Sequence, residues 1–143
     1  MKIVERSALV AYSPQQMFAV VNDVVAYPEF LPWCSGARIL NQSDVEMVAR
    51  LELEKAGIKQ SFTTRNTWDR PATMAMNLVE GPFSHFKGVW SLQGLGDVGC
   101  RVSIKLEFEL NSRVMNATLG RVFSVASDKM VDAFCQRAER IYG

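Results

Sequence analysis

Apolar and polar residues alternate along the segment from Cys100 to Leu110. Every second side chain there is apolar or a thiol, and those between are Arg, Ser, Lys or Glu. Because successive side chains of a strand point to opposite faces, this pattern predicts a strand with one buried and one solvated face. The same period of two, broken mostly at Gly or Pro, extends over residues 37–110 and predicts a meander of antiparallel strands.

The N-terminal part of the chain predicts a strand followed by a short helix. Residues 2–11 are rich in β-forming side chains. Ser13 followed by Pro14 is a typical helix start, because serine caps free backbone N–H groups and proline fits the first turn. The helix is expected to end near Asn22 and Asp23. Its apolar face consists of Met17, Phe18, Val20 and Val21.

Two prolines restrict the next segment, Tyr27–Trp33, to a compact turn that carries large apolar side chains. We expect this turn at the edge between sheet and helix. There it would serve either as a lid over a cavity or as a plug in a tight core. The turn Gly81-Pro82-Phe83 is a second candidate element of a cavity rim, and would present Phe83 there.

From Asn111 onward, apolar residues recur at intervals of three and four, which predicts one long amphipathic helix ending near Tyr142. About 30 helical residues would span ~45 Å. A bend or a loosened first turn is expected at Gly120, because glycine weakens a helix interior. The apolar stripe consists of Met115, Leu119, Val122, Phe123, Ala126, Met130, Phe134 and Ile141.

These elements predict an α+β fold in a single domain, residues 1–143. A curved antiparallel sheet of six or seven strands would wrap around the long C-terminal helix, with short helices after the first strand. A curved sheet cannot contact the helix everywhere, so room for an apolar cavity is expected between them. Whether side chains fill that room stays open at this stage. Methionine adapts to irregular contents, and five methionines are expected to face inward: Met47, Met74, Met76, Met115 and Met130.

Composition and net charge limit which kinds of molecule the protein is expected to bind. Hydrophobic residues make up 48% and charged residues 22% of the chain, which is typical of a globular protein. A net charge of +1 gives no bulk attraction to nucleic acid or membrane, so such a partner would have to meet a local basic patch. The final helix has a mild basic excess. Its cations at positions 113, 121, 129 and 137 turn by ~80° per step and spread around the helix.

Residues suited to catalysis or metal binding are sparse. The three cysteines lie far apart, which favours a reduced, cytoplasmic setting and argues against a zinc site or a disulfide framework. Cys34 is expected to be a buried thiol, and the lone histidine, His85, a surface or rim hydrogen-bonding residue. Hydrolase triads and nucleotide-binding fingerprints are absent from the sequence. Glu5 and Arg6 interrupt any N-terminal apolar run, so no secretory signal is expected. We therefore predict no catalytic residue, no metal and no enzyme.

Several blocks of the sequence resemble the START-like, helix-grip superfamily of polyketide cyclases, dehydrases and lipid-transport proteins. Within it, the chain is similar to the coenzyme Q-binding and ribosome association toxin family. The resemblance covers essentially the whole chain. It rests on Ala11-Tyr12-Ser13, Val21-Asn22-Asp23-Val24, Tyr27-Pro28-Glu29-Phe30-Leu31-Pro32-Trp33-Cys34, Thr63-Thr64-Arg65-Asn66, Leu78-Val79-Glu80-Gly81-Pro82-Phe83, Gly120-Arg121-Val122-Phe123, and Ala133-Phe134 with Arg137-Ala138.

The resemblance implies non-enzymatic binding of a hydrophobic ligand, a polyprenylated quinone such as ubiquinone, by a carrier or chaperone that supports respiration. It also implies an alternative: a toxin that binds the large ribosomal subunit and blocks subunit joining. Aromatic polyketide cyclase or dehydratase chemistry, known elsewhere in the superfamily, would need an acid or base inside the cavity. A transient membrane contact and a small antitoxin protein are further partners to consider.

Bound ligand in such a cavity would be held mainly by burial of apolar surface, so the lining matters more than any single polar group. For each candidate residue, ordinary core packing is the competing explanation. The predicted ligand-binding residues are Tyr27, Phe30, Leu31, Trp33, Met76, Phe83, Phe86, Trp90, Met115, Leu119 and Phe123.

Overall fold

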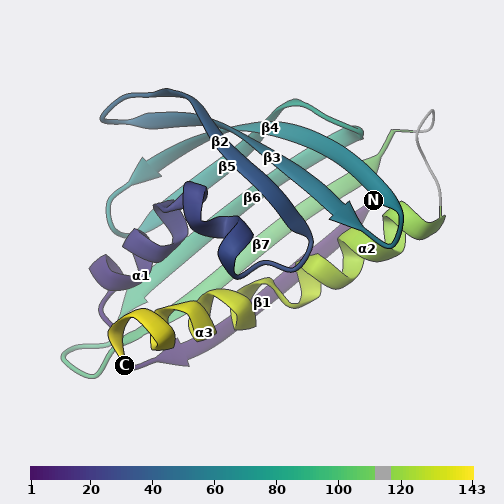
Figure 1. Ribbon diagram of the computed structural model, residues 1–143. Helices are drawn as coiled ribbons and strands as arrows, with labels where there is room; N and C mark the ends of the chain where they lie inside the picture. The colour runs from purple at the N-terminus through teal and green to yellow at the C-terminus, as the bar shows by residue number, and fades with distance from the viewer. Residues whose placement is uncertain (112–116) are drawn as a thin grey trace.

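A computed structural model describes residues 1–111 and 117–143 and shows a curved sheet with its helices on one face (Figure 1). Within this part, seven antiparallel strands run in the order β1-β7-β6-β5-β4-β3-β2. The expected α+β architecture and meander are confirmed. The strands are β1 (Lys2–Val10), β2 (Cys34–Gln42), β3 (Glu46–Lys55), β4 (Ile58–Asp69), β5 (Thr73–Glu80), β6 (Phe83–Gly94) and β7 (Cys100–Leu110). The helices are α1 (Pro14–Asn22), the 3-10 helix η1 (Val24–Glu29), α2 (Ala117–Asp128) and α3 (Met130–Tyr142).

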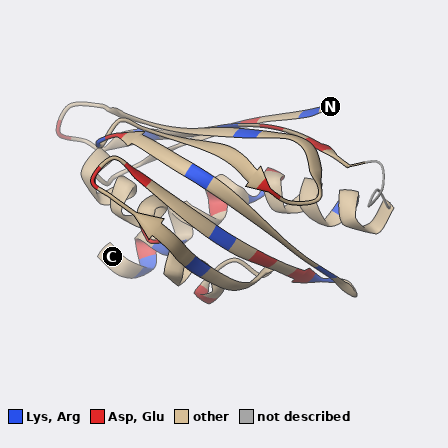
Figure 2. Cartoon of the chain, turned by 90° about the horizontal axis from the view of Figure 1, so that it is seen from above, with Lys and Arg blue, Asp and Glu red and all other residues tan. Residues whose placement is uncertain are grey.

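Strand β7 has the two faces that its alternation predicts. Its apolar residues from Cys100 to Phe108 are at most 5% exposed, and the residues between them are exposed or half-buried. Strand β1 pairs with β7 from Lys2 opposite Phe108 to Val10 opposite Cys100, so the N-terminal strand forms the edge of the sheet. The opposite face carries mixed charges along the strands (Figure 2), some of them paired across neighbouring strands.

Helix α1 begins where Ser13 and Pro14 predict. The Ser13 hydroxyl accepts a hydrogen bond from the Gln16 backbone N–H at 3.1 Å, and the Gln16 side-chain oxygen accepts one from the Ser13 N–H at 2.9 Å. This reciprocal pair is a capping box, which satisfies two N–H groups that the first turn leaves free. The helix ends at Asn22, as expected, and the chain enters η1 one residue after Asp23.

The β3–β4 hairpin turns at Ala56 and Gly57, one of the breaks at glycine in the predicted meander. Both residues have positive φ angles, 54° and 79°, and Lys55 pairs with Ile58 directly across the turn. A two-residue loop of this kind matches the twist of the flanking strands. It carries Lys55 at the tip of the hairpin, beside α2 (Figure 1).

The prediction of one long C-terminal helix is wrong in one respect. The structure has two helices, α2 and α3, separated at Lys129. Gly120, where a bend was expected, lies inside α2. The interruption follows Ser127, a buried residue whose hydroxyl donates to the Phe123 carbonyl at 2.8 Å. Such a bond to the carbonyl four residues earlier bends helices, and offers a physical reason for a break at this point. The apolar stripe nevertheless continues through both helices as far as Phe134, but Ile141, which was predicted to belong to it, is 49% exposed.

Phe83 does not stand at a rim, contrary to the sequence prediction. Its side chain is 6% exposed and packs in an aromatic cluster with Phe62, Phe86, Phe108 and Phe123, with ring centroids 4.9 to 6.4 Å from its own. Gly81 makes the inward direction possible. Its φ is 156°, and a Cβ there would lie 2.6 Å from the Phe62 Cβ, closer than packed carbons approach. The turn therefore closes tightly over the core.

Candidate functional site

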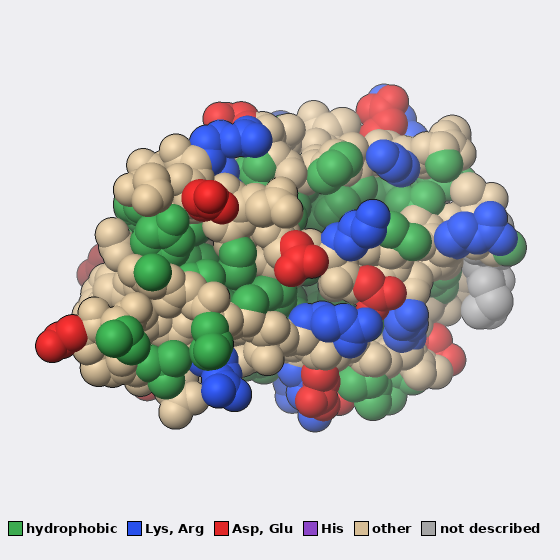
Figure 3. Space-filling view, turned by 90° about the horizontal axis from the view of Figure 1, so that it is seen from below, with side chains coloured by type: hydrophobic (Ala, Val, Ile, Leu, Met, Phe, Trp, Pro, Cys, Tyr) green, Lys and Arg blue, Asp and Glu red, His purple; other side chains and the backbone are tan. Residues whose placement is uncertain are grey.

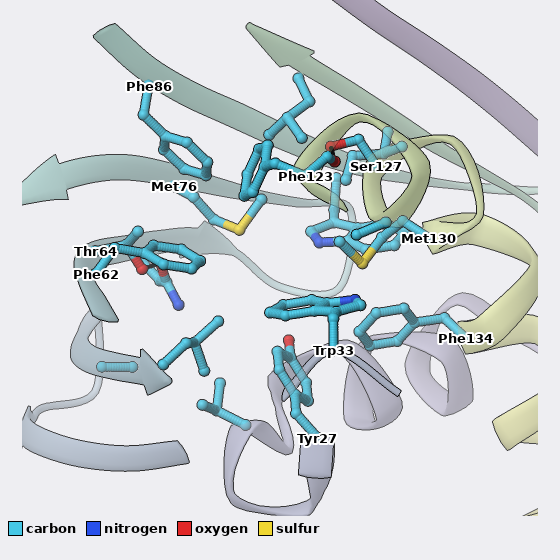
Figure 4. Close-up of a pocket in the computed structure, with 18 residues that line it drawn as sticks. Tyr27, Trp33, Phe62, Thr64, Met76, Phe86, Phe123, Ser127, Met130 and Phe134 are labelled. Atoms are coloured by element: carbon cyan, nitrogen blue, oxygen red, sulfur yellow. Dashed lines mark hydrogen bonds between the residues drawn. The ribbon is translucent and has the colours of Figure 1, made fainter. Parts of the chain in front are cut away.

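An apolar chamber lies between the concave face of the sheet, the C-terminal helices and the η1 segment. Tyr27 reaches it from η1 and Trp33 from the residue before β2, Met76 reaches it from the sheet, and Phe123 and Phe134 from α2 and α3 (Figure 4). Its volume is about 50 Å³. The lining residues are Val24, Tyr27, Trp33, Ala49, Leu51, Phe62, Thr64, Asn66, Met76, Phe86, Trp90, Ile104, Leu106, Phe123, Ala126, Ser127, Met130 and Phe134.

The chamber exists where the sequence predicts it, but it is small. One water molecule needs roughly 10–15 Å³ by this measure, so the chamber has room for a few waters and not for a quinone with an isoprenoid tail. Large side chains take up most of the space: Trp90, 2% exposed, lies with its ring centroid 4.9 Å from that of Phe134. A larger guest would require these side chains to move.

A groove of about 290 Å³ adjoins the chamber and opens to the surface between the β3–β4 hairpin and the C-terminal helices. Trp33, Ala126 and Met130 line both spaces. These three side chains therefore form the partition between groove and chamber. The groove is bordered by Leu31, Pro32, Trp33, Lys55, Ala56, Arg121, Val122, Val125, Ala126, Lys129, Met130 and Ala133.

Two adjacent polar residues of β4 give the chamber wall its hydrogen-bonding capacity. Thr64 and Asn66 are each 4% exposed, and the Thr64 hydroxyl donates to the Asn66 side-chain oxygen at 2.9 Å. In the described part of the chain, no hydrogen bond joins the Asn66 amide nitrogen to another residue. This nitrogen is not one of the described side-chain atoms that are fully buried without a partner, so it keeps an accessible side and is free to donate to a guest that brings an oxygen acceptor.

Among the described residues that line the chamber, none carries a carboxylate, imidazole or amine, and the one titratable group is the phenol of Tyr27. Burial, together with the nearby Cys34 and Asp23, raises the pKa of that phenol, and its hydroxyl donates to the Val21 carbonyl. Cys34 lies nearby. Burial raises the pKa of its thiol to about 11, and its sulfur donates to the Gly36 carbonyl at 3.3 Å. Both groups stay protonated near neutral pH, so neither supplies a base or a nucleophile.

The structure brings six of the predicted residues to the chamber wall: Tyr27, Trp33, Met76, Phe86, Trp90 and Phe123. Leu31 borders the groove instead. Phe30 lies outside the chamber, with its ring 5.1 Å from Phe134 and the Arg137 guanidinium 5.2 Å from its own centroid. Phe83 and Leu119 are core residues, 6% and 2% exposed, that line neither space. Met115 lies outside the described residues. Contact of any of them with a ligand stays a prediction.

Some lining residues that were not predicted to bind a ligand nevertheless show a simple signal in the sequence. Thr64 and Asn66 occupy the positions between Phe62 and Trp68 at a period of two, which places polar side chains on the inward face of a strand. That signal would have identified them. Ser127 and Phe134 lie on the inward stripe of the C-terminal helices and are 1% exposed. The position of Val24 depends on how η1 folds back, which no local pattern indicates.

The face that carries the C-terminal helices shows hydrophobic side chains exposed among Lys, Arg, Asp and Glu (Figure 3). On an ideal helix the side chains of Arg121 and Lys129 would point in directions ~80° apart. In the structure both border the groove, and Lys55 of the hairpin borders it too. No acidic residue borders the groove in the described part of the chain. The site is thus an apolar groove with a basic rim that leads to a small inner chamber.

No helix in the described ranges, 1–111 and 117–143, combines the length and hydrophobicity that a membrane crossing needs.

Comparisons with known proteins identify the family and the fold to which this chain is similar. The model of the family described as "Polyketide cyclase / dehydrase and lipid transport" matches residues 10–135. "Ribosome association toxin RatA" of Vibrio cholerae is 46% identical over 143 residues, which are 100% of this chain and 99% of that protein. "Coenzyme Q-binding protein COQ10, mitochondrial" of Drosophila melanogaster is 27% identical over 96% of this chain and 59% of that protein. The crystal structure of the Streptomyces Zhui aromatase/cyclase superposes with a TM-score of 0.82 at 23% identity, over 97% of this chain and 94% of that one, which shows a common fold.

Proposed function

Because this chain belongs to the polyketide cyclase / dehydrase and lipid transport family, we propose that it acts by binding, as a toxin that associates with the large ribosomal subunit and blocks subunit joining. The observation that carries this proposal is the 46% identity, over the full length of both chains, to a protein named for ribosome association. Under this proposal the protein is cytoplasmic and not an enzyme, and a small antitoxin protein is a candidate partner.

The geometry supports ribosome association over quinone transport in two ways. The chamber of about 50 Å³ does not hold an isoprenoid quinone without rearrangement. The helix face, by contrast, presents the cations Lys55, Arg121 and Lys129 with no acidic residue beside them in the described part of that groove. A local cluster of this kind meets the requirement set by a net charge of only +1, because phosphate contacts need nearby cations and not a basic chain overall.

Catalysis of the cyclase or dehydratase type is disfavoured by the chamber wall. Such chemistry moves protons on a bound substrate and needs a group with a pKa near the working pH. The described lining offers a phenol and neutral hydroxyl and amide groups. The nearby Cys34, with a thiol pKa of about 11, is also a poor proton acceptor at neutral pH. Non-enzymatic action is therefore part of the proposal.

Sedimentation tests the ribosomal partner directly. Purified protein mixed with dissociated ribosomal subunits is expected to migrate with the large subunit in a sucrose gradient at moderate salt, and to reduce the peak of joined ribosomes when magnesium is restored. A protein of similar size and charge but unrelated fold serves as the control for nonspecific adsorption. If the chain stays at the top of the gradient at all salt concentrations, the ribosomal role is wrong.

Binding of a neutral quinone is the second candidate, favoured by one specific observation: the unpartnered amide nitrogen of Asn66 in the chamber wall. A quinone carbonyl is a suitable acceptor, and the isoprenoid tail would extend past Trp33 and Met130 into the groove. The similarity to the Drosophila coenzyme Q-binding protein supports this candidate more weakly, at 27% identity.

Replacing Asn66 by leucine, which is similar in volume, tests the quinone candidate. One neutral hydrogen bond contributes about 0.5–1.5 kcal/mol, so N66L is expected to weaken binding of decylubiquinone roughly twofold to tenfold. Titration followed by intrinsic tryptophan fluorescence measures the affinity, with Asn77→Leu on an exposed position of β5 as the matched control. Unchanged affinity in N66L, or no binding by the parent protein, would remove this candidate without affecting the ribosomal one.

A further inference from the structure

We propose that the groove between the β3–β4 hairpin and the C-terminal helices binds a free, single-chain anionic amphiphile, such as a long-chain carboxylate. Its charged head would lie among Lys55, Arg121 and Lys129, and its chain would follow the apolar floor toward the chamber. This site is distinct from a quinone headgroup site at Asn66 and does not depend on ribosome association.

The charge of the groove is the first argument. Its three charged lining residues are all basic and exposed, although the chain as a whole has 16 basic and 15 acidic residues. In the described part of the chain none of the three forms an ion pair, whereas Arg6, Arg65 and Arg137 each lie within 3.3 Å of a carboxylate oxygen. Three unpaired cations around one groove favour an anionic group, which would gain charge-assisted hydrogen bonds there.

The floor of the groove is the second argument. The other nine of its twelve lining residues are all apolar, and Val125 among them is 47% exposed. Exposed apolar surface bordered by charge is typical of a binding site, because covering it removes apolar area from water. An inorganic anion would satisfy the cations and leave this floor exposed. A ligand with an anionic end and an apolar chain satisfies both parts.

The groove adjoins the chamber, and the partition between them limits the ligand to a narrow, flexible chain. Trp33, Ala126 and Met130 separate the groove from the chamber, and the thioether of Met130 is half-buried. Methionine is unbranched and changes conformation at low cost, so its movement would admit a narrow chain. A flexible hydrocarbon chain can pass such a partition, whereas a protein helix about 10 Å wide cannot.

Nucleic-acid bases fit the floor of the groove less well than a hydrocarbon chain does. Single-stranded RNA is commonly held by aromatic side chains on which bases stack, and by polar groups that contact base edges. The one aromatic residue of the described lining, Trp33, is 7% exposed and faces the chamber, and neutral polar side chains do not occur among the twelve lining residues. The cations at the rim can contact phosphate, as the proposed ribosomal role requires, but phosphate contact leaves the apolar floor uncovered, and a hydrocarbon chain would cover it.

Quenching by a brominated fatty acid tests both the ligand class and the place. Dibromostearate below its micelle concentration is expected to quench the fluorescence of Trp33, because bromine quenches only at close range and the proposed chain lies against that ring. The methyl ester of the same acid is the neutral control. Replacing Trp33 by phenylalanine should remove most of the quenching, while Trp68→Phe, a partly exposed tryptophan on β4 that lines neither space, should leave it.

Charge variants complete the test. The triple variant Lys55→Gln, Arg121→Gln, Lys129→Gln is expected to bind the carboxylate at least about tenfold more weakly and to bind the ester unchanged. These side chains are exposed, so the fold should persist, and an unchanged melting temperature verifies it. The variant Lys87→Gln, Lys105→Gln, on the opposite face of the sheet, is the matched control and should bind as the parent does.

Four outcomes would overturn the proposal. The first is equal affinity for acid and ester, and the second is quenching as strong in the Trp33→Phe variant as in the parent, since Trp90 in the chamber wall would account for only a remainder. The third is that the parent protein ignores monomeric dibromostearate, whether it binds no lipid at all or sediments only with anionic vesicles. If the triple variant loses sedimentation with ribosomal subunits but keeps its affinity for the carboxylate, the groove is an RNA-binding surface and the amphiphile site is wrong.

Discussion

Replacing Phe123 by alanine is expected to lower the free energy of unfolding by about 3–5 kcal/mol, the range measured when a buried phenylalanine is truncated. Phe123 is 4% exposed, and its ring centroid lies between 4.5 and 6.1 Å from those of Phe62, Phe83, Phe86 and Phe108. It is the side chain by which α2 joins the aromatic cluster of the sheet. The alanine variant therefore loses both buried apolar area and the ring contacts.

Urea unfolding followed by tryptophan fluorescence measures this loss. Val125→Ala on the same helix is the matched control, because Val125 is 47% exposed and its truncation should change stability by about 0.5 kcal/mol or less. The difference between the two variants isolates burial from helix propensity. A loss below 1 kcal/mol in F123A would mean that α2 does not pack against the sheet in solution.

Local sequence patterns were sufficient to predict most of the fold, because the features concerned are determined by residues close together in the sequence. The alternation in β7 determines which face is buried, and Ser13 with Pro14 determines where α1 begins. The hairpin at Ala56 and Gly57 follows from short-range turn chemistry. Each of these features depends on the residue itself and on neighbours close in sequence.

Features that depend on distant contacts were predicted less well. A Gly-Pro-Phe turn does not indicate whether Phe83 faces solvent or core; that depends on Phe62 lying beneath Gly81. The helix interruption follows Ser127, whose hydroxyl bonds to the backbone in a buried setting that the sequence alone does not reveal.

The candidate site, too, could be predicted only in part, because some of its features depend on contacts between residues far apart in the sequence. Six of the predicted residues do line the chamber, because large inward side chains of a sheet and its covering helix tend to meet. The volume of the chamber depends on rotamers, which periodicity does not encode. The basic rim combines Lys55 of the hairpin with Arg121 and Lys129 of the C-terminal helices. Only the folded topology brings these residues together, so a charge count along one helix does not detect it.

A chain that ends at Leu110 is expected to be insoluble. The helices beyond this point cover the concave face of the sheet, and they bury Leu119, Phe123 and Phe134, each at most 4% exposed. Their removal would expose the apolar face of β6 and β7 together with the aromatic cluster, a contiguous apolar surface that monomeric proteins rarely present to water.

Fractionation of the expressed truncate measures this outcome, since aggregated chain collects in the pellet. A chain ending at Arg140 is the matched control. It lacks Ile141 and Tyr142, which are 49% and 37% exposed, and loses the hydrogen bond from the Tyr142 hydroxyl to the Gln16 carbonyl, so it should remain soluble with a modest loss of stability. If the chain ending at Leu110 is soluble and shows the cooperative unfolding of a packed sheet, the helices are not its cover. The chamber and the groove, both of which have α2 and α3 as a wall, would then not exist in solution, and every binding proposal made from them would lose its site.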